Sequence, residues 1–286
     1  MCVLRAALAL LLLAQFSTSC AAARFEHDLL SLPLEASSVV FVDPVNGDDG
    51  NCAVHPLGTP NTASCRSVRG ALALTLPPNV TIYLMNSGVH QVCDATINAS
   101  YVTLAAYCSG STDSNCTSIV DCNGCGSCLI ALRGADPFTL RGLQVTGSQH
   151  CAIIHQGSLN LVGVTLRQHT GSLLSGNGTA NSSLVLVNCT IFDNRVSDGF
   201  SSPLISYVSG SVSMTSTVIA NNSVGALAQL LHTAGAALFA LQDCSILNNS
   251  ADPASLISLL EVVNSGSILL TRVRIRENRG YQVLLI

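Results

Sequence analysis

The sequence predicts an all-β fold, a parallel β-helix, and two observations support this prediction. One short pattern recurs along the second half of the chain, and its shared aliphatic position falls at Leu166, Ile191, Ile219, Ile246 and Ile275. Intervals of 25 to 29 residues indicate a solenoid with one supersecondary unit per repeat. Inside each copy, apolar residues alternate with polar or small ones, which is typical of strands rather than helices.

Each repeat is expected to form three short strands. In one copy Leu184 and Leu186 face inward, Asn188 interrupts the run, and Cys189 and Ile191 continue inward. Glycine and asparagine adopt a left-handed conformation at low cost, so the interruption predicts a sharp bend between two strands. The expected bend residues are Gly142, Gly163, Asn188, Ser216, Asp243 and Arg272. Upstream strands are expected at Ile153-Ile154, Leu204-Ile205, Leu230-Leu231 and Leu259-Leu260, and earlier turns around 81–84, 102–105 and 138–145.

The pattern ends in an asparagine in four copies, at Asn194, Asn222, Asn249 and Asn278. Stacked turns of a parallel β-helix lie about 4.8 Å apart, which places these four side chains in one column. Their amides can then hydrogen-bond to the neighbours above and below. The rival solenoid, a leucine-rich repeat, needs a different leading pattern and a helical or extended convex segment, which the Ser- and Gly-rich connecting segments do not match.

The chain is expected to divide into four regions. Residues 1–23 have the layout of a signal peptide, with a short basic start, an apolar run over 6–16 and small residues before cleavage after Ser19 or Ala23. A membrane span needs about 20 apolar residues, so this run is too short and no span is expected in the mature chain. A leader or linker (24–38), an N-terminal strand with a capping helix (39–80) and the β-helix (81–286) follow. The chain stops in mid-turn at Ile286 without a polar cap, so we expect further turns beyond it.

Composition supports a secreted location and excludes one class of partner. Of eight Asn-x-Ser/Thr sequons, we expect glycosylation at those placed in loops, namely Asn79, Asn98, Asn177 and Asn181. The formal charge is −4, and the 12 basic residues are all arginines without a basic face. A nucleic-acid partner is therefore not expected.

These residues resemble the pectin-lyase-like superfamily of right-handed parallel β-helices. The segments 41–50, 58–60 and 65–72 are similar to the strand, Gly-Asp turn and capping helix that open many such domains. The I-x-x-N element that ends at each column asparagine also resembles the F-x-x-N repeat of polymorphic outer-membrane proteins. The resemblance covers about residues 39–286 and implies a right-handed β-helix.

The resemblance also implies where an active site should be sought. Enzymes of the superfamily act on acidic polysaccharides with several clustered carboxylates, or with acidic Ca²⁺ ligands and an arginine base. Between 150 and 265 the acidic residues are Asp193, Asp198, Asp243, Asp252 and Glu261. Asp193 and Asp243 fall at the column turn and the bend, away from the expected groove. No catalytic motif carries over, and no cofactor is predicted.

Three weaker groups of candidates remain. His155, His232 and Glu261 lie near upstream strands, where such folds carry their binding groove. The acidic segment 43–49 has the oxygen density for Ca²⁺ but not the spacing of a calcium loop, so a capping turn is the competing interpretation. The arginines at 272, 274 and 276 should face outward, either to contact an anionic glycan or as a solvated edge.

The 13 cysteines suit an oxidising compartment. We expect a disulfide between Cys52 and Cys65, which closes the loop before the capping helix. The cluster 122–128 has the spacing of a zinc site, but the cysteines around it favour disulfides. Cys189 and Cys244 share one inward position two turns apart, about 9–10 Å, which is too far for a disulfide. Both should be buried free thiols.

The sequence therefore favours a noncatalytic extracellular module, structural, adhesive or glycan-binding, whose partner is a polysaccharide or matrix. The alternative is a polysaccharide lyase or glycoside hydrolase of the same superfamily with an unrecognised site. Too few acidic residues gather on one face to favour the enzyme.

Overall fold

The computed structural model describes residues 38–58, 63–86, 88–107, 117–132, 137–179, 181–196, 203–225, 231–251, 258–263, 266–280 and 282–285. These residues belong to one compact unit, Ala36–Ile286. The expected signal peptide lies outside the described residues, as does all of the expected linker except Ser38.

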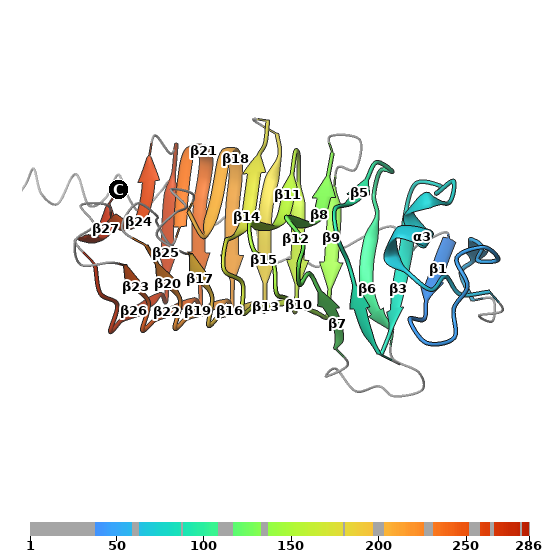
Figure 1. Cartoon of the computed structure of the whole chain (residues 1–286). Coiled ribbons are helices and arrows are strands. Elements are labelled where there is room, and N and C mark those ends of the chain that lie inside the picture. Colours follow the sequence, from blue (N-terminus) through green and yellow to red (C-terminus); the bar gives the residue numbers. More distant parts are fainter. Residues whose placement is uncertain are drawn as a thin grey trace, which may run out of the picture. The chain divides into compact units, whose positions relative to one another are not determined.

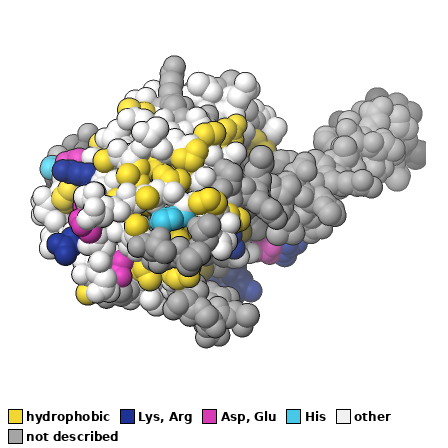
Figure 2. Space-filling view, turned by 90° about the vertical axis from the view of Figure 1, so that its right-hand side faces the viewer, with side chains coloured by type: hydrophobic (Ala, Val, Ile, Leu, Met, Phe, Trp, Pro, Cys, Tyr) yellow, Lys and Arg dark blue, Asp and Glu magenta, His cyan; other side chains and the backbone are white. Residues whose placement is uncertain are grey.

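The unit opens with β1 (Ser38–Val42), which pairs antiparallel with β2 (His55–Pro56) and parallel with β3 (Val80–Met85). The short helix α3 (Val68–Ala73) follows β2, and the Ser67 side chain caps its start by accepting from the Gly70 N–H at 2.9 Å. Its buried Val68 joins the core. Figure 2 shows the side of the molecule on the right in Figure 1, where β1 and α3 lie, with hydrophobic side chains gathered across its middle. The capping role of the helix stays a prediction.

Three sheets wind around the core, as the three-strand repeat predicts, and apart from the β1–β2 pair their described strands are parallel. The large sheet holds an upstream and a downstream strand from each turn, and two long strands, β18 (Ile205–Thr215) and β21 (Leu231–Gln242), join both parts. Its other upstream strands are β5 (Ala95–Ile97), β8 (Ser127–Ala131), β11 (Cys151–His155), β14 (Ser172–Asn177), β24 (Ser258–Val263) and β27 (Gln282–Leu285). Its other downstream strands are β6 (Thr103–Tyr107), β9 (Phe138–Arg141), β12 (Leu159–Val162), β15 (Ser183–Val187) and β25 (Ile268–Thr271).

An eight-stranded sheet and a three-stranded sheet complete the turns. The eight-stranded sheet consists of β4 (Val89–Gln91), β7 (Ser118–Asp121), β10 (Leu143–Thr146), β13 (Thr165–Arg167), β16 (Thr190–Phe192), β19 (Val218–Ala220), β22 (Ser245–Leu247) and β26 (Arg274–Arg276). The third sheet consists of β17 (Arg195–Val196), β20 (Ser223–Val224) and β23 (Ser250–Ala251). Figure 1 shows the strands stacked in chain order. The fold is a right-handed parallel β-helix, and the leucine-rich-repeat alternative is excluded.

The core is built from columns of stacked aliphatic side chains. Leu166 pairs in register with Ile191, which pairs with Ile219, which pairs with Ile246, and all four side chains are buried. Full burial of each such side chain stabilises the fold by about 1.5–3 kcal/mol. The shared aliphatic position of the repeat is therefore the inward position of the eight-stranded sheet.

Two columns of left-handed residues turn the chain at the corners of each repeat. The first column confirms the predicted bend, because all six of its residues have φ between 50° and 63°. The second column, which was not predicted from the sequence, lies directly before the asparagine column. Its members are Gly147, Gln168, Asp193, Asn221, Asn248 and Glu277. Non-glycine residues adopt this conformation at a cost of about 1–2 kcal/mol each, so the stacking of the turns must hold them there.

The asparagine column is confirmed, and it bonds more extensively than predicted. The Asn222 Nδ2 donates to Asn249 Oδ1 at 2.9 Å and to the Ile191 carbonyl oxygen at 3.0 Å. Asn222 Oδ1 accepts from both the backbone N–H and the side-chain amide of Asn194, at 3.1 and 2.8 Å. Each internal amide thus joins three consecutive turns.

His169 occupies the next position of this column and replaces the asparagine. Its Nδ1 accepts from the Ser148 backbone N–H at 3.0 Å, and its Nε2 lies 3.0 Å from the Val145 carbonyl oxygen. This geometry assigns the neutral ring with its proton on Nε2. The ring is 1% exposed, and burial lowers its pKa from the usual 6.5 to about 4.

The described cysteines include three disulfides and three buried thiols. The disulfides join Cys52 to Cys65, the pair named from the sequence, Cys93 to Cys125, and Cys122 to Cys128. The cluster at 122–128 is therefore held in disulfides and not arranged as a zinc site. Cys151, Cys189 and Cys244 are free and buried.

Removing one internal column amide should destabilise the fold strongly. Asn222→Ala removes the acceptor of the buried Asn194 backbone N–H and the side-chain donor to the Ile191 carbonyl, at about 1–3 kcal/mol per group, so we expect a loss of about 3 kcal/mol or more. Urea unfolding followed by circular dichroism measures it. Asn221→Gly is the matched control, because glycine tolerates the positive φ of that exposed position. Equal midpoints for both variants would contradict the role of the column.

The buried His169 should make stability depend on pH. Its folded-state pKa lies below its unfolded value, so the unfolded chain binds the proton first and the free energy of unfolding falls as the pH drops from about 6.5 to about 4. The His169 contribution to this loss approaches about 3 kcal/mol at the acid end. His169→Asn should remove this part of the slope while keeping the column. Parallel pH slopes for the two proteins in urea unfolding would refute the assignment.

The two aligned cysteines should react only after unfolding. Burial raises the pKa of Cys189 to about 11 and raises that of Cys244, which keeps both as thiols in the folded chain. We expect no alkylation of either in the native protein and full alkylation in denaturant without reductant, mapped on peptides. Recovery of Cys189 linked to Cys244 would contradict the register of the turns.

Candidate functional site

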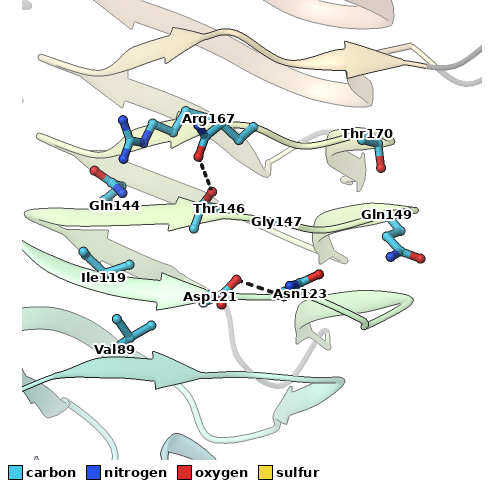
Figure 3. A pocket seen from close by; sticks show the side chains of 11 residues that line it. Val89, Ile119, Asp121, Asn123, Gln144, Thr146, Gly147, Gln149, Arg167 and Thr170 are labelled. Atoms are coloured by element: carbon cyan, nitrogen blue, oxygen red, sulfur yellow. Dashed lines mark hydrogen bonds between the residues drawn. The ribbon is translucent and has the colours of Figure 1, made fainter.

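An open groove of about 500 Å³ lies on the outer face of the eight-stranded sheet and its adjoining corner. Strands β4, β7, β10 and β13 supply its floor, and the second left-handed corner supplies its rim (Figure 3). The lining residues are Val89, Ile119, Asp121, Asn123, Gln144, Thr146, Gly147, Gln149, Arg167, Gln168 and Thr170. The floor residues alternate with the inward residues of their strands, so the register that fills the core also assembles the groove.

Among the described lining residues, Asp121 is the one with a carboxylate. Its Oδ2 accepts from Gln91 Nε2 at 2.8 Å, and its Oδ1 accepts from the Asn123 backbone N–H at 3.0 Å. Gly147 lies beside it with φ +83°, and a Cβ at this position would lie 2.7 Å from Asp121 Oδ1. The absence of a side chain at Gly147 therefore leaves room for the carboxylate at the groove floor.

Arg167, two strands from Asp121, supplies the guanidinium of the described part of the lining. With the amide of Gln144 turned so that its oxygen faces Arg167, that oxygen accepts from Nε at 3.2 Å and from Nη2 at 3.1 Å. The guanidinium carbon also lies 5.9 Å from the centre of the Phe192 ring, within the range of a cation–π contact. These two contacts position the arginine while leaving donors for a ligand.

The strand register continues the line of Arg167 beyond the groove. Thr146 pairs with Arg167, and Arg167 pairs with Phe192. The same outward line then runs through Ala220 and Leu247 to Arg276. It ends at an exposed arginine of the predicted outward-facing run.

Of the three residues proposed from the sequence for a groove, the structure buries His155 and pairs the other two in register. His155 is 1% exposed, and its ring stacks on buried Tyr207 with centroids 5.4 Å apart. The expectation that His155 lines a groove was therefore wrong, because strand alternation points it into the core. Gly176 lies between the two rings, and a Cβ there would collide with His155.

His232 and Glu261 pair in register on neighbouring turns, between β21 and β24. Glu261 is partly buried, and it is not among the described residues that line the groove. Their part in any site stays a prediction. They lie on the large sheet, away from the eight-stranded sheet that carries the groove.

The acidic N-terminal segment satisfies its carboxylates with protein donors. Asp43 accepts from the backbone N–H groups of Val45 and Asn46, and Asp49 accepts from Arg66 and Ser67 ahead of α3. Hydrogen bonds from Gly50 and Asn51 hold the pKa of Asp48 below its usual value. These hydrogen bonds are typical of a turn that holds the residues directly before α3, which is the capping-turn interpretation of this segment.

The four favoured sequons differ in their settings. Asn98 and Asn181 are exposed outside the strands, Asn79 is partly buried with φ 60°, and Asn177 is the exposed last residue of β14 rather than a loop residue. Their glycosylation stays a prediction.

Comparisons with known proteins yield fold-level likenesses alone. No family model matches the chain, and no curated protein matches its sequence. Among solved structures, the chain is similar to the GH136 lacto-N-biosidase from Eubacterium ramulus, at 9% identity and TM-score 0.49, over 86% of this chain and 68% of that one. It is also similar to a rhamnogalacturonan lyase, at 10% identity and TM-score 0.45, over 86% and 69%. The A-module of mannuronan C-5 epimerase AlgE4 from Azotobacter vinelandii has 11% identity and TM-score 0.26, over 72% and 89%.

At these values the likenesses carry no information about activity, and the fold assignment rests on the strand pairing described above. Membership in the pectin-lyase-like superfamily, and the likeness to outer-membrane repeats, stay predictions. Within the described residues, no helix has the length and hydropathy needed to cross a membrane.

Proposed function

We propose that this protein is a noncatalytic extracellular β-helix that binds a polysaccharide along the outer face of its eight-stranded sheet. The observation that carries the proposal is the polar lining of the groove: one carboxylate, one guanidinium, and several amides and hydroxyls in an open concavity. Amides and hydroxyls both donate and accept hydrogen bonds, as sugar hydroxyls do. The groove therefore suits a carbohydrate better than an apolar ligand.

The extended outward line favours a polymer over a small sugar. From Thr146 to Arg276 it crosses five strand spacings, about 24 Å. Its middle consists of the apolar, partly exposed side chains of Phe192, Ala220 and Leu247, on which the C–H faces of sugar rings can pack. Arg167 and Arg276 stand at opposite ends of this middle section, where both can donate to oxygen atoms of a long chain.

The acid content of the groove argues for binding without cleavage. Glycoside hydrolysis generally needs two carboxyl groups across the scissile bond, about 5–9.5 Å apart. Asp121 is the single acid in the described lining, and both of its oxygens already accept hydrogen bonds. Asp121 can orient a ligand hydroxyl, but it has no partner carboxylate to act as the second catalytic group.

The disulfides, the expected signal peptide and the exposed sequons support the proposed extracellular location. Disulfides within the described residues fit an oxidising compartment, as does the expected signal peptide at 1–23. Glycans at Asn98, Asn177 and Asn181 are part of this proposal, because these side chains are exposed.

Replacing the groove arginine should weaken polysaccharide binding. Arg167→Ala removes a charged donor, which is worth about 1.5–3 kcal/mol, so we expect affinity to fall about tenfold or more. Retention of acidic and neutral polysaccharides on immobilised full-length protein, followed by titration calorimetry of those retained, measures the change. Arg141→Ala is the control, because it also removes an arginine from a strand, but one on β9 of the large sheet, outside the groove.

Product analysis with the same polysaccharides separates binding from catalysis. We expect no new reducing ends and no unsaturated products. Cleavage that disappears in Asp121→Asn, or in Glu261→Gln, would replace the binding proposal with the lyase or hydrolase alternative. If Arg167→Ala bound these polysaccharides as tightly as the unmodified protein, the proposal that the groove is the binding site would be wrong.

A further inference from the structure

Three asparagines among the described residues precede a glycine, at Asn46, Asn123 and Asn177. In such a pair the glycine backbone nitrogen can attack the asparagine side-chain carbonyl carbon, because glycine has no Cβ to block the approach. The attack needs a glycine N–H that is free of other hydrogen bonds and a backbone that is not locked into a strand. The local sequence is similar at all three pairs, so the fold must decide which of them reacts.

The fold protects two of the three pairs. The N–H of Gly47 donates to the Asp43 carbonyl oxygen at 2.9 Å, and the Asn46 side-chain amide donates to the Asp43 carboxylate at 3.1 Å. The N–H of Gly178 donates to the Val208 carbonyl oxygen at 2.9 Å, in the ladder between neighbouring turns. Attack from either nitrogen would first have to break a hydrogen bond of the folded chain.

The third pair, Asn123 and Gly124, lacks such a protecting hydrogen bond among the described residues. Asn123 and Gly124 are both exposed at the tip of a turn that closes with a hydrogen bond from the Cys125 N–H to the Cys122 carbonyl oxygen at 3.1 Å. Within the described part of the chain, the Gly124 N–H has no hydrogen-bond acceptor. Gly124 has φ +80°, and beyond Gly124 and its two chain neighbours no described atom lies within 4 Å of the position that a Cβ would occupy. Among the described residues, therefore, no hydrogen bond of the folded chain has to break before the Gly124 nitrogen can attack.

We propose that Asn123 is a site of spontaneous deamidation in the folded protein. The deprotonated Gly124 nitrogen bonds to Asn123 Cγ, and the bond from Cγ to the side-chain nitrogen breaks and releases ammonia. Water then opens the resulting succinimide ring at one of its two carbonyls, which yields aspartate or isoaspartate at position 123. Water is the co-reactant, and no oxidant or reductant takes part.

The product places a second carboxylate in the groove. Asn123 lines the groove, and its backbone N–H donates to Asp121 Oδ1 at 3.0 Å, so the new charge lies close to Asp121. Like charges repel at such a distance, and an anionic polysaccharide would meet two negative groups instead of one. This consequence for ligand choice rests on the proposed function. The modification itself does not.

Incubation of the folded full-length protein in mildly alkaline buffer tests the site. Peptide mapping by mass spectrometry should find the amide-to-acid mass gain at Asn123 well before Asn46 or Asn177, and isoaspartyl methyltransferase should label the same peptide. The rate should fall in mildly acidic buffer, where less nitrogen is deprotonated. Where Asn177 carries a glycan, Asn46 serves as the internal control.

A denatured and reduced sample is the matched comparison. Without the fold, the three sites should react at similar rates, because the two protecting hydrogen bonds are lost. Asn123 remaining unmodified in the folded protein, while all three convert in the denatured chain, would overturn the proposal. Conversion of Asn46 or Asn177 ahead of Asn123 in the folded protein would do the same.

Two variants separate the modification from its effect on binding. Asn123→Gln should stay unmodified, and Asn123→Asp should carry the product charge from the start. We expect Asn123→Asp to lose a larger share of its retention of an anionic polysaccharide than of a neutral one. Conversion at Asn123 with unchanged retention by Asn123→Asp would uphold the modification site and overturn its link to the groove.

Discussion

Hydrogen bonding along the asparagine column aligns the turns, and the remaining features of the structure depend on that alignment. Each internal amide bonds the turn before it and the turn after it, through side chain and backbone together. A strand that slipped by one residue would turn its inward side chains to solvent, and it would also break these bonds. The column and the aliphatic core therefore select the same register. Left-handed residues directly ahead of the column are held in place by the same contacts.

The N-terminal part of the helix uses different means to hold its turns. The column ends at His169, which bonds Ser148 and Val145 in place of an asparagine. In the turns before His169, disulfides connect the chain instead. The disulfide between Cys93 and Cys125 joins neighbouring turns, and the disulfide between Cys122 and Cys128 closes the turn that carries Asn123. The groove spans this boundary, with Arg167 on the column side and Asp121 on the disulfide side. At the boundary between the turns joined by the asparagine column and the turns joined by disulfides, the outward positions do not have to follow the repeat. Chemically different side chains can therefore lie side by side there.

The candidate site was less predictable than the fold because it uses the positions that the repeat leaves variable. Asp121, Gln144 and Arg167 alternate with core residues, but they belong to three different turns of irregular spacing. Only the pairing of β7, β10 and β13 places them side by side. His155 failed as a groove residue for the same reason, since one step of strand alternation decides whether a side chain meets solvent or, as here, Tyr207.

The sequence by itself determined the strand content, the solenoid, the bend column, the asparagine column and the aligned free cysteines. All of these follow from local conformational preference and from a period that repeats at each turn. Tertiary structure alone decided which outward residues share a line, which Asn-Gly pair keeps a free backbone nitrogen, and that His169 substitutes for an asparagine. These features depend on contacts between turns 20 or more residues apart, and no local pattern encodes a distance across the stack.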